Sequence, residues 1–246
     1  MDIKEIREKG FSFEKDLNQK KLSVKPENFW YPYGIMNNLI HLDNLLTGEN
    51  RDLLSLIDKK PVLDIGSADG DLAFFFESLG IEVDVIDYSP TNFNGMEDVK
   101  LLKKTLNSSV EIYNLDIDSQ FSMPAKNYGL ILLLGTLYHL KNPYFILETL
   151  SKRGTYCLLS TRITKFSPDK KTHLASLPVA YLVDPRETNN DPTNYWMFSK
   201  KGLERIINRT GWEICDFMTV GNTIDSDPAS KEGDERAFCL LKSLRM

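Results

Sequence analysis

Acidic and small residues alternate in a short stretch that follows the first strongly apolar run of the chain. Asp64, Gly66, Ala68 and Gly70 lie two residues apart, and a helix-forming sequence begins just after them. Small residues let the backbone approach a ligand closely, and the free N–H groups at the start of a helix favour a carboxylate. Asp64 has the charge to meet an amino group. The spacing therefore predicts a turn that binds the ammonium and the carboxylate of an amino acid.

Two further acids follow at the ends of the next predicted strands. Asp87 ends the apolar run 81–87, the position at which an acid accepts hydrogen bonds from ribose hydroxyls. Asp116 follows the run 109–115, where it can accept from an adenine amine while Ile117 lies against the ring. An amino acid, a ribose and an adenine in this order describe S-adenosylmethionine.

Other ligands that bind glycine-rich turns fit less well. A dinucleotide fingerprint aligned on Gly66 needs glycines at positions 68 and 71, which are Ala68 and Asp71. The turn also lacks the lysine of a P-loop. The alternative to a ligand site is a structural glycine turn with two incidental acids at the ends of strands.

The Asp64–Gly70 pattern and Asp87 resemble the class I S-adenosylmethionine-dependent methyltransferases, from about Lys60 to the C-terminus. A closer resemblance lies in "LLLGTLYHLKNP", which is similar to the branch containing the tRNA wobble-uridine carboxymethyltransferase. That resemblance implies a carboxylated donor, held in part by Tyr138 and Arg236. The basic segment of that branch corresponds here to "FWYPYGIMNN", which has no lysine or arginine. An unpaired buried carboxylate is costly, so plain S-adenosylmethionine is favoured.

The elements that must position these residues alternate between strand and helix patterns. Residues 1–58 are expected to form an N-terminal helical extension or lid, and residues 59–246 a methyltransferase domain. Strands are predicted near 60–65, 81–87, 109–115, 128–135, 154–161, 212–220 and 236–244, and a helix is predicted over 89–108, started by a Ser-Pro pattern. The fold class is therefore a doubly wound, Rossmann-like α/β sheet of seven strands, the last antiparallel. Residues 162–197 are less regular, and their role stays open.

Four further positions are candidates for the acceptor and the chemistry. His139, after the fourth predicted strand, is either a general base or a structural hydrogen bond to a nearby loop. Trp30 and Tyr33 belong to the aromatic stretch "FWYPYG", which is either a lid over the ligands or a core plug. Arg162 ends the fifth predicted strand and either holds an anionic acceptor or pairs with an acid.

The complete set of predicted site residues has three parts. The catalytic candidates are His139 and Tyr138. The donor-binding candidates are Asp64, Gly66, Ser67, Ala68, Gly70, Asp87, Tyr88, Asp116, Ile117, Gly135 and Tyr138. The acceptor-binding candidates are Trp30, Tyr33, Arg162 and Arg236, and no metal site is expected.

Composition limits the partners. The 246 residues carry a net charge of −5, which mildly disfavours RNA because RNA-binding proteins usually have a basic footprint. The three cysteines are far apart, the N-terminus is too charged for a signal peptide, and no apolar run is long enough to span a membrane. We expect a cytoplasmic methyltransferase that acts on a small-molecule or sugar-like acceptor. The alternatives are a tRNA uridine-modifying enzyme and a non-catalytic protein that binds S-adenosylmethionine.

Overall fold

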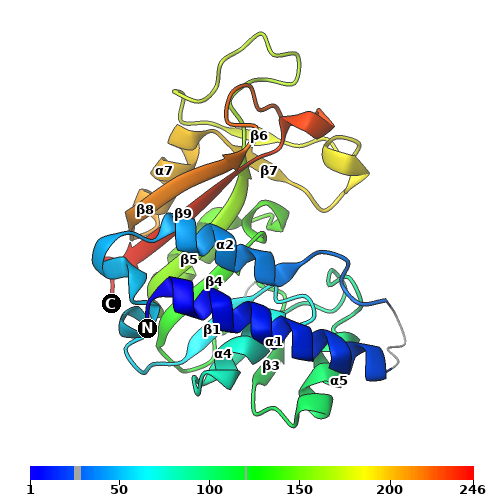
Figure 1. Cartoon of the computed structure of the whole chain (residues 1–246). Coiled ribbons are helices and arrows are strands. Elements are labelled where there is room, and N and C mark those ends of the chain that lie inside the picture. The colour runs from blue at the N-terminus through cyan, green and yellow to red at the C-terminus, as the bar shows by residue number, and fades with distance from the viewer. Residues whose placement is uncertain (25–28, 120) are drawn as a thin grey trace. The chain divides into compact units, whose positions relative to one another are not determined.

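The computed structural model describes residues 1–24, 29–119 and 121–246, which form two compact units (Figure 1). The first unit runs from Met1 to Leu132 and the second from Leu133 to Met246. The predicted extension, residues 1–58, falls within the first unit, and its residues 25–28 lie outside the described residues. Its boundary at residue 58 stays a prediction.

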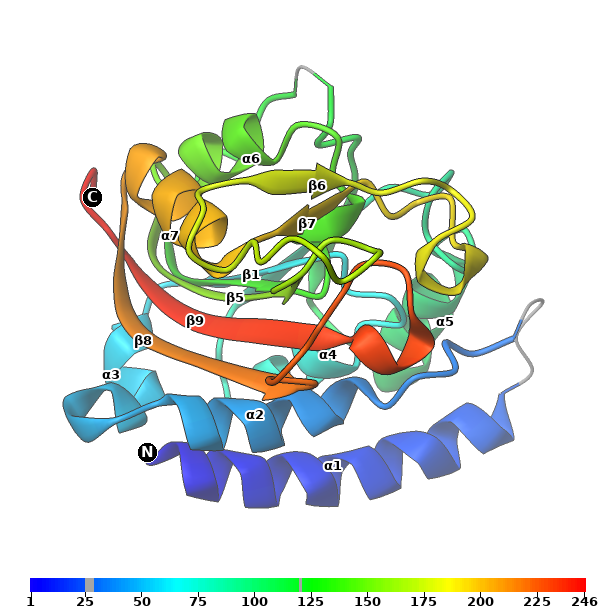
Figure 2. The same cartoon turned by 90° about the horizontal axis from the view of Figure 1, so that it is seen from above.

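Helices make up the described part of the N-terminal region. They are α1 (Ile3–Ser23), η1 (Ile35–Asn37), α2 (Asn38–Leu45), η2 (Gly48–Arg51) and α3 (Leu53–Ile57). The Asp2 carboxylate caps α1 by accepting from the Lys4 N–H. Lys20 and Lys21 lie in the last turn, where a positive charge interacts favourably with the helix dipole. Helices α1 and α2 run side by side in both views (Figures 1 and 2), and α1 also packs on the later helix α4.

Four parallel strands form the sheet of the first unit, in the order β3-β2-β1-β4. They are β1 (Val62–Ile65), β2 (Val83–Asp87), β3 (Glu111–Asn114) and β4 (Tyr128–Leu134), the last of which crosses into the second unit. Helices α4 (Asp71–Ser78) and α5 (Glu97–Leu106) connect β1 to β2 and β2 to β3. Every residue of β1 is buried, as in a strand covered on both faces. The carboxyl ends of β1, β2 and β3 therefore carry the loops that contain the predicted donor site.

The helix predicted to begin after Ser89 begins only at Glu97. Gly95 and Met96 have φ angles of +69° and +66°, which a right-handed helix does not allow. The Asn92 side-chain oxygen accepts from the Asn94 and Met96 N–H groups and so stabilises an irregular turn instead. The Ser-Pro pattern marks the start of this turn, so the predicted start of the helix was wrong.

The described part of the second unit combines three short helical turns, two longer helices and five strands. They are η3 (Leu137–His139), α6 (Pro143–Leu150), β5 (Gly154–Ile163), β6 (Ala180–Leu182), η4 (Thr188–Asn190), β7 (Trp196–Phe198), α7 (Lys200–Arg209), β8 (Trp212–Gly221), η5 (Lys231–Gly233) and β9 (Glu235–Ser243). Strand β9 runs antiparallel to both β5 and β8, and the long β8–β9 pair is visible in Figure 2. Strand β7 is parallel to β5, and β6 is antiparallel to β7.

The predicted mixed α/β architecture, with parallel strands, an antiparallel last strand and helices at the N-terminus, is confirmed. The described residues contain nine strands. Seven correspond to the predicted runs, and the short strands β6 and β7 lie in the segment that the sequence pattern left irregular. Across the same described ranges, none of the helices combines the length and apolar character that a bilayer crossing requires.

Candidate functional site

The turn after β1 is built by three residues in left-handed backbone conformation. Gly66, Ala68 and Gly70 have φ angles of +71°, +53° and +86°. Side chains are rarely tolerated there, and a Cβ added to Gly70 would come within 2.8 Å of Val99 Cγ2. The Gly66 N–H donates to the Ile86 carbonyl at 2.9 Å, which fixes the start of the turn on the neighbouring strand. The small residues at these positions therefore have a conformational cause.

Asp64 lies at the base of this turn as a buried acid. Asp64 is only 5% exposed. Within residues 1–24, 29–119 and 121–246, its carboxyl has neither a hydrogen bond nor an ion pair. Burial raises the pKa of Asp64 to about 7, and repulsion from Asp87 and Asp71 adds to the rise. A cation placed here would stabilise the ionised carboxylate, so the site favours a ligand that carries an ammonium.

Ser67 supplies a second buried polar atom without a partner. Its hydroxyl oxygen is inaccessible to water and has no hydrogen bond within the part of the chain that the structure describes. The Ser67 carbonyl accepts from the Gly70 N–H at 2.8 Å, and α4 begins one residue later at Asp71. An unpaired hydroxyl and an unpaired acid in one turn fit a ligand that donates and accepts hydrogen bonds.

Asp87 ends β2 and is already partly hydrogen-bonded. It accepts from the Tyr88 N–H at 2.8 Å and from Asn92 Nδ2 at 2.9 Å. Burial raises the pKa of Asp87, against hydrogen bonds from Tyr88, Asn92 and the backbone of Ala68 that lower it. The Ala68 contact joins Asp87 to the turn after β1, so the two predicted motifs meet.

The third predicted contact follows β3. The Leu115 N–H donates to the Asp87 carbonyl at 2.9 Å, which brings the ends of β2 and β3 together. Asp116 Oδ1 accepts from the Asp118 N–H at 3.0 Å, and Ile117 is buried. The loop is therefore ordered by its own acid, with an apolar side chain beside it.

The predicted aromatic residues of the first unit lie near the same turn. The Tyr31 N–H donates to Asp69 Oδ2 at 2.9 Å, while the Trp30 ring lies 5.3 Å from Lys21 Nζ. The ring of Tyr31 makes edge contacts with Tyr33 and Phe93, at centroid distances of 5.4 and 5.7 Å. Tyr33 is 72% exposed, so this residue is not a core plug.

In the second unit, Tyr138 and His139 form η3. Gly135, with a φ of +74°, precedes it and donates its N–H to the Ser160 carbonyl at 3.0 Å. The Tyr138 and His139 rings lie 4.2 Å apart, and Tyr138 is buried.

The tautomer of His139 follows from its hydrogen bonds. Nδ1 lies 3.1 Å from the Thr193 carbonyl, which can only accept, so Nδ1 carries the proton. The Thr193 hydroxyl lies 2.9 Å from Nδ1 and donates to Asp191 Oδ1 at 2.6 Å. Burial lowers the pKa of His139, which keeps the ring neutral at pH 7 with a lone pair on Nε2. The loop contact predicted as the structural alternative is present, and it leaves Nε2 in the form of a base.

The two predicted arginines share one acid. Arg162 and Arg236 are directly opposite in the β5–β9 pair. Arg162, 6% exposed, has its Nε 2.8 Å from Asp234 Oδ1, and Arg236 Nε is 3.4 Å from Asp234 Oδ2. Arg236 Nη1 also donates to the Tyr138 hydroxyl at 3.4 Å. The acid beside Arg236 is Asp234, the residue just before β9, and not Glu235. Glu235 instead accepts from the Ser226 hydroxyl at 2.6 Å.

Comparison with known proteins identifies the family. The model of a family described as "Methyltransferase domain" matches residues 41–216. The chain belongs to this methyltransferase family. A comparison with curated proteins gives no match.

Solved structures share the fold of this chain. The N-terminal domain of EvdMO1, crystallised with S-adenosylhomocysteine bound, has a TM-score of 0.59 and 13% identity, over 99% of this chain and 97% of that chain. The same domain in the presence of S-adenosylhomocysteine and D-fucose gives 0.58 and 12%, over 99% and 97%. A putative methyltransferase from Bacillus halodurans C-125 gives 0.55 and 12%, over 78% and 98%.

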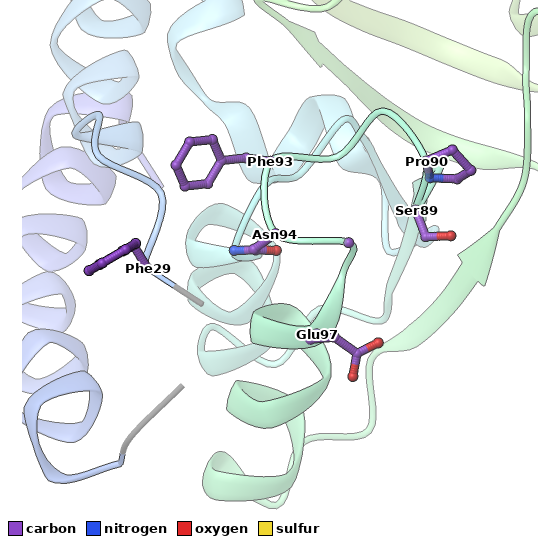
Figure 3. A pocket seen from close by; sticks show the side chains of 7 residues that line it. Phe29, Ser89, Pro90, Phe93, Asn94 and Glu97 are labelled. Carbon is purple, nitrogen blue, oxygen red and sulfur yellow. The ribbon is translucent and has the colours of Figure 1, made fainter. Parts of the chain in front are cut away.

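The first unit also has an open cavity that the sequence did not indicate. It measures about 630 Å³ and is lined by Phe29, Ser89, Pro90, Phe93, Asn94, Gly95 and Glu97 (Figure 3). None of the predicted donor-binding residues lines it. Phe29 and Phe93 are 85% and 57% exposed, and because only the structure shows this exposure, the sequence carried no clear signal for the cavity.

The first unit also contains a buried ionic cluster that the sequence did not predict. Lys21 of α1 pairs with Asp69 and Asp71, and Asn94 Nδ2 donates to Asp69 Oδ1 at 2.8 Å. The only sequence signal is that Asp69 and Asp71 flank Gly70. The predicted site residues thus fall into two groups, one in each unit, and this cluster belongs to the first.

Proposed function

We propose that this methyltransferase binds S-adenosylmethionine through the Asp64–Gly70 turn and transfers its methyl group to a small-molecule acceptor. The observation that carries the proposal is the buried Asp64 carboxyl, which lacks a partner within the described ranges and has its pKa raised to about 7. A structure rarely retains such a group without a use, because an unpaired buried charge is costly. The ammonium of S-adenosylmethionine supplies the missing charge.

The remaining donor-binding residues take roles that match their chemistry. Ser67 and the N–H groups of the turn would bind the donor's carboxylate, and Asp87 would accept from the ribose hydroxyls. Asp116, Ile117 and Tyr88 would surround the adenine. Gly135 and Tyr138 belong to the second unit, and their contact with the donor stays a prediction.

The chain's task in the reaction is small. When bound, S-adenosylmethionine supplies an activated methyl group on a sulfonium. The protein must hold the acceptor in line with the methyl–sulfur bond and remove a proton if the acceptor is a hydroxyl or a protonated amine. We assign the role of proton acceptor to His139 Nε2. The hydrogen bond from Nδ1 to Thr193 fixes the tautomer, and burial keeps the imidazole neutral. Tyr138 packs against this ring and would orient it.

Several features support a small acceptor. Trp30 and Tyr33 offer aromatic surface, and Arg162 and Arg236 offer positive charge for a polar group. The net charge of −5 disfavours a large RNA partner. A structural neighbour crystallised in the presence of D-fucose agrees with a sugar-like acceptor.

A second candidate function uses a carboxylated donor to modify a tRNA uridine. The observation that favours it is the contact between Arg236 Nη1 and the Tyr138 hydroxyl, the two residues that the closer resemblance assigns to the donor carboxylate. Asp234 already pairs with Arg236, which weakens this candidate.

Mass spectrometry of the ligand that co-purifies, followed by calorimetry with S-adenosylhomocysteine, tests the proposal. We expect micromolar binding by the wild type and at least ~10-fold weaker binding by Asp64→Asn, which keeps the size and removes the charge. Equal affinity would contradict the role of Asp64. A preference for the carboxylated donor that is lost in Arg236→Ala would favour the second candidate. Binding without methyl transfer to any acceptor in a broad panel would indicate a non-catalytic protein.

A further inference from the structure

The last turn of α1 inserts a buried ammonium beside the donor-binding turn. Lys21 is 8% exposed, although lysine is rarely buried unless it is paired. Its Nζ donates to Asp71 Oδ1 at 2.7 Å, to Asp71 Oδ2 at 3.0 Å and to Asp69 Oδ2 at 3.2 Å. These three bonds use all three protons of the ammonium. Lys21 therefore acts on the two acids and has no proton left for a ligand.

The acids outnumber this cation. Burial raises the pKa of Asp71, of Asp98 and of Glu14, and in each case Lys21 acts in the opposite direction. Within the described ranges of the chain, Lys21 is the only cation that forms an ion pair with Asp69 or Asp71. Its removal would leave buried carboxylates without compensation on both sides of Gly70.

Asp69 links Lys21 to the turn after β1. It is fully buried, and its carboxylate also accepts from the Tyr31 N–H and from Asn94 Nδ2. Asp69 and Asp71 enclose Gly70, whose left-handed conformation leads into α4. A hydrogen bond thus joins the first residue of α4 to a residue 50 positions earlier in the chain.

We propose that Lys21 is a positioning residue for the methyl donor. Its ammonium holds Asp69 and Asp71 so that the Gly66–Gly70 turn keeps the shape that binds S-adenosylmethionine. This inference rests on the proposed function, because it takes that turn as the donor site. Since the donor requires the turn and the turn requires Lys21, donor binding and docking of the end of α1 stabilise each other.

Calorimetry with S-adenosylhomocysteine tests this role through Lys21→Met, with Lys20→Met as the matched control, because Lys20 is exposed on the same helix turn. We expect Lys21→Met to weaken binding 10- to 100-fold at a thermal midpoint that still leaves the protein folded, and Lys20→Met to bind as the wild type. The double variant Lys21→Met/Asp71→Asn removes the uncompensated acid as well and should regain part of the affinity. Wild-type affinity in Lys21→Met would overturn the proposal.

Hydrogen exchange of the wild-type protein gives a second test that does not depend on the variant folding. S-adenosylhomocysteine should slow exchange both in residues 66–72 and in the last two turns of α1. Slowing confined to residues 66–72 would overturn the coupling. The two hypotheses fail separately: absence of binding by the wild type contradicts the proposed function, whereas binding that ignores Lys21 contradicts only this inference.

Discussion

The turn after β1 and the segment around η3 differ in whether their charged side chains have partners. In the first unit Asp64 is buried without a partner in the described ranges, and burial raises its pKa to about 7. In the second unit Arg162 and Arg236 both pair with Asp234, and His139 Nδ1 is bonded to Thr193. The first region lacks a charge that a ligand would supply, while the second is already held in place by its own residues. Substitutions in the first should therefore alter donor affinity, and substitutions in the second should alter protonation.

The largest effect is expected from Gly66→Val. A β-branched side chain is strained at a φ of +71° and would occupy the space that the ligand needs. We predict at least a ~100-fold loss of S-adenosylhomocysteine affinity, about 2.7 kcal/mol, measured by calorimetry. Gly80→Ala is the control, because Gly80 has a φ of +81° but lies outside the turn with no atom within 4 Å of an added Cβ. Equal losses in both variants would mean that strain, and not the site, is responsible.

A smaller loss is expected from Asp87→Ala. This change removes the proposed ribose contact, and a hydrogen bond to a charged group contributes about 1.5–3 kcal/mol. Asp87 also accepts from Tyr88 and Asn92, so some loss of thermal stability should accompany the weaker binding. If thermal stability collapses while the affinity of the remaining folded protein is unchanged, Asp87 has only a structural role.

The raised pKa of Asp64 predicts a pH dependence with a definite sign. The folded-state pKa of about 7 exceeds the ordinary value of 3.8, so the folded protein keeps a proton that the unfolded chain releases between these values. This contribution to stability is complete below about pH 4 and is lost as the pH rises to about 7. A bound ammonium favours the ionised carboxylate, so binding near pH 6 should release roughly one proton.

Calorimetry in buffers of different ionisation enthalpy measures that proton. Asp64→Asn should abolish the release at pH 6, and the wild type should show little release at pH 8.5. A release that persists in Asp64→Asn would assign the proton to another group.

The smallest effects are expected in the second unit. Asp191 raises the pKa of His139 and Arg236 lowers it, although burial dominates and lowers it overall. Asp191→Asn should therefore lower the His139 pKa and Arg236→Met should raise it, each by less than about one unit. NMR titration of the His139 ring measures both. Shifts of the same sign in the two variants would show that the ring has moved and not merely lost a neighbouring charge.

The elements and the donor turn could be read from local patterns. The strands β1 to β5, β8 and β9 were predicted from the spacing of apolar residues and from the Gly and Pro residues that bound the apolar runs. These signals depend only on neighbouring residues. The spacing of Gly66, Ala68 and Gly70 was informative for the same reason, since each needs a conformation that few residues adopt. The start of α5 was not predicted, because side-chain hydrogen bonds of Asn92 override a helix-start pattern.

Only the tertiary structure decided how charges are compensated. Lys21 reaches Asp71 across 50 positions, and Thr193 reaches His139 across 54. Arg162 of β5 pairs with Asp234, the residue just before β9, because β9 runs antiparallel to β5 with Arg236 opposite Arg162. Such pairings depend on which distant segments pack together, and burial then sets the pKa of each group. The sequence by itself predicted the turn and a ligand for it. Packing determined the partner of each acid: within the described ranges Asp69 and Asp71 pair with Lys21, Asp87 has hydrogen bonds, and Asp64 has neither.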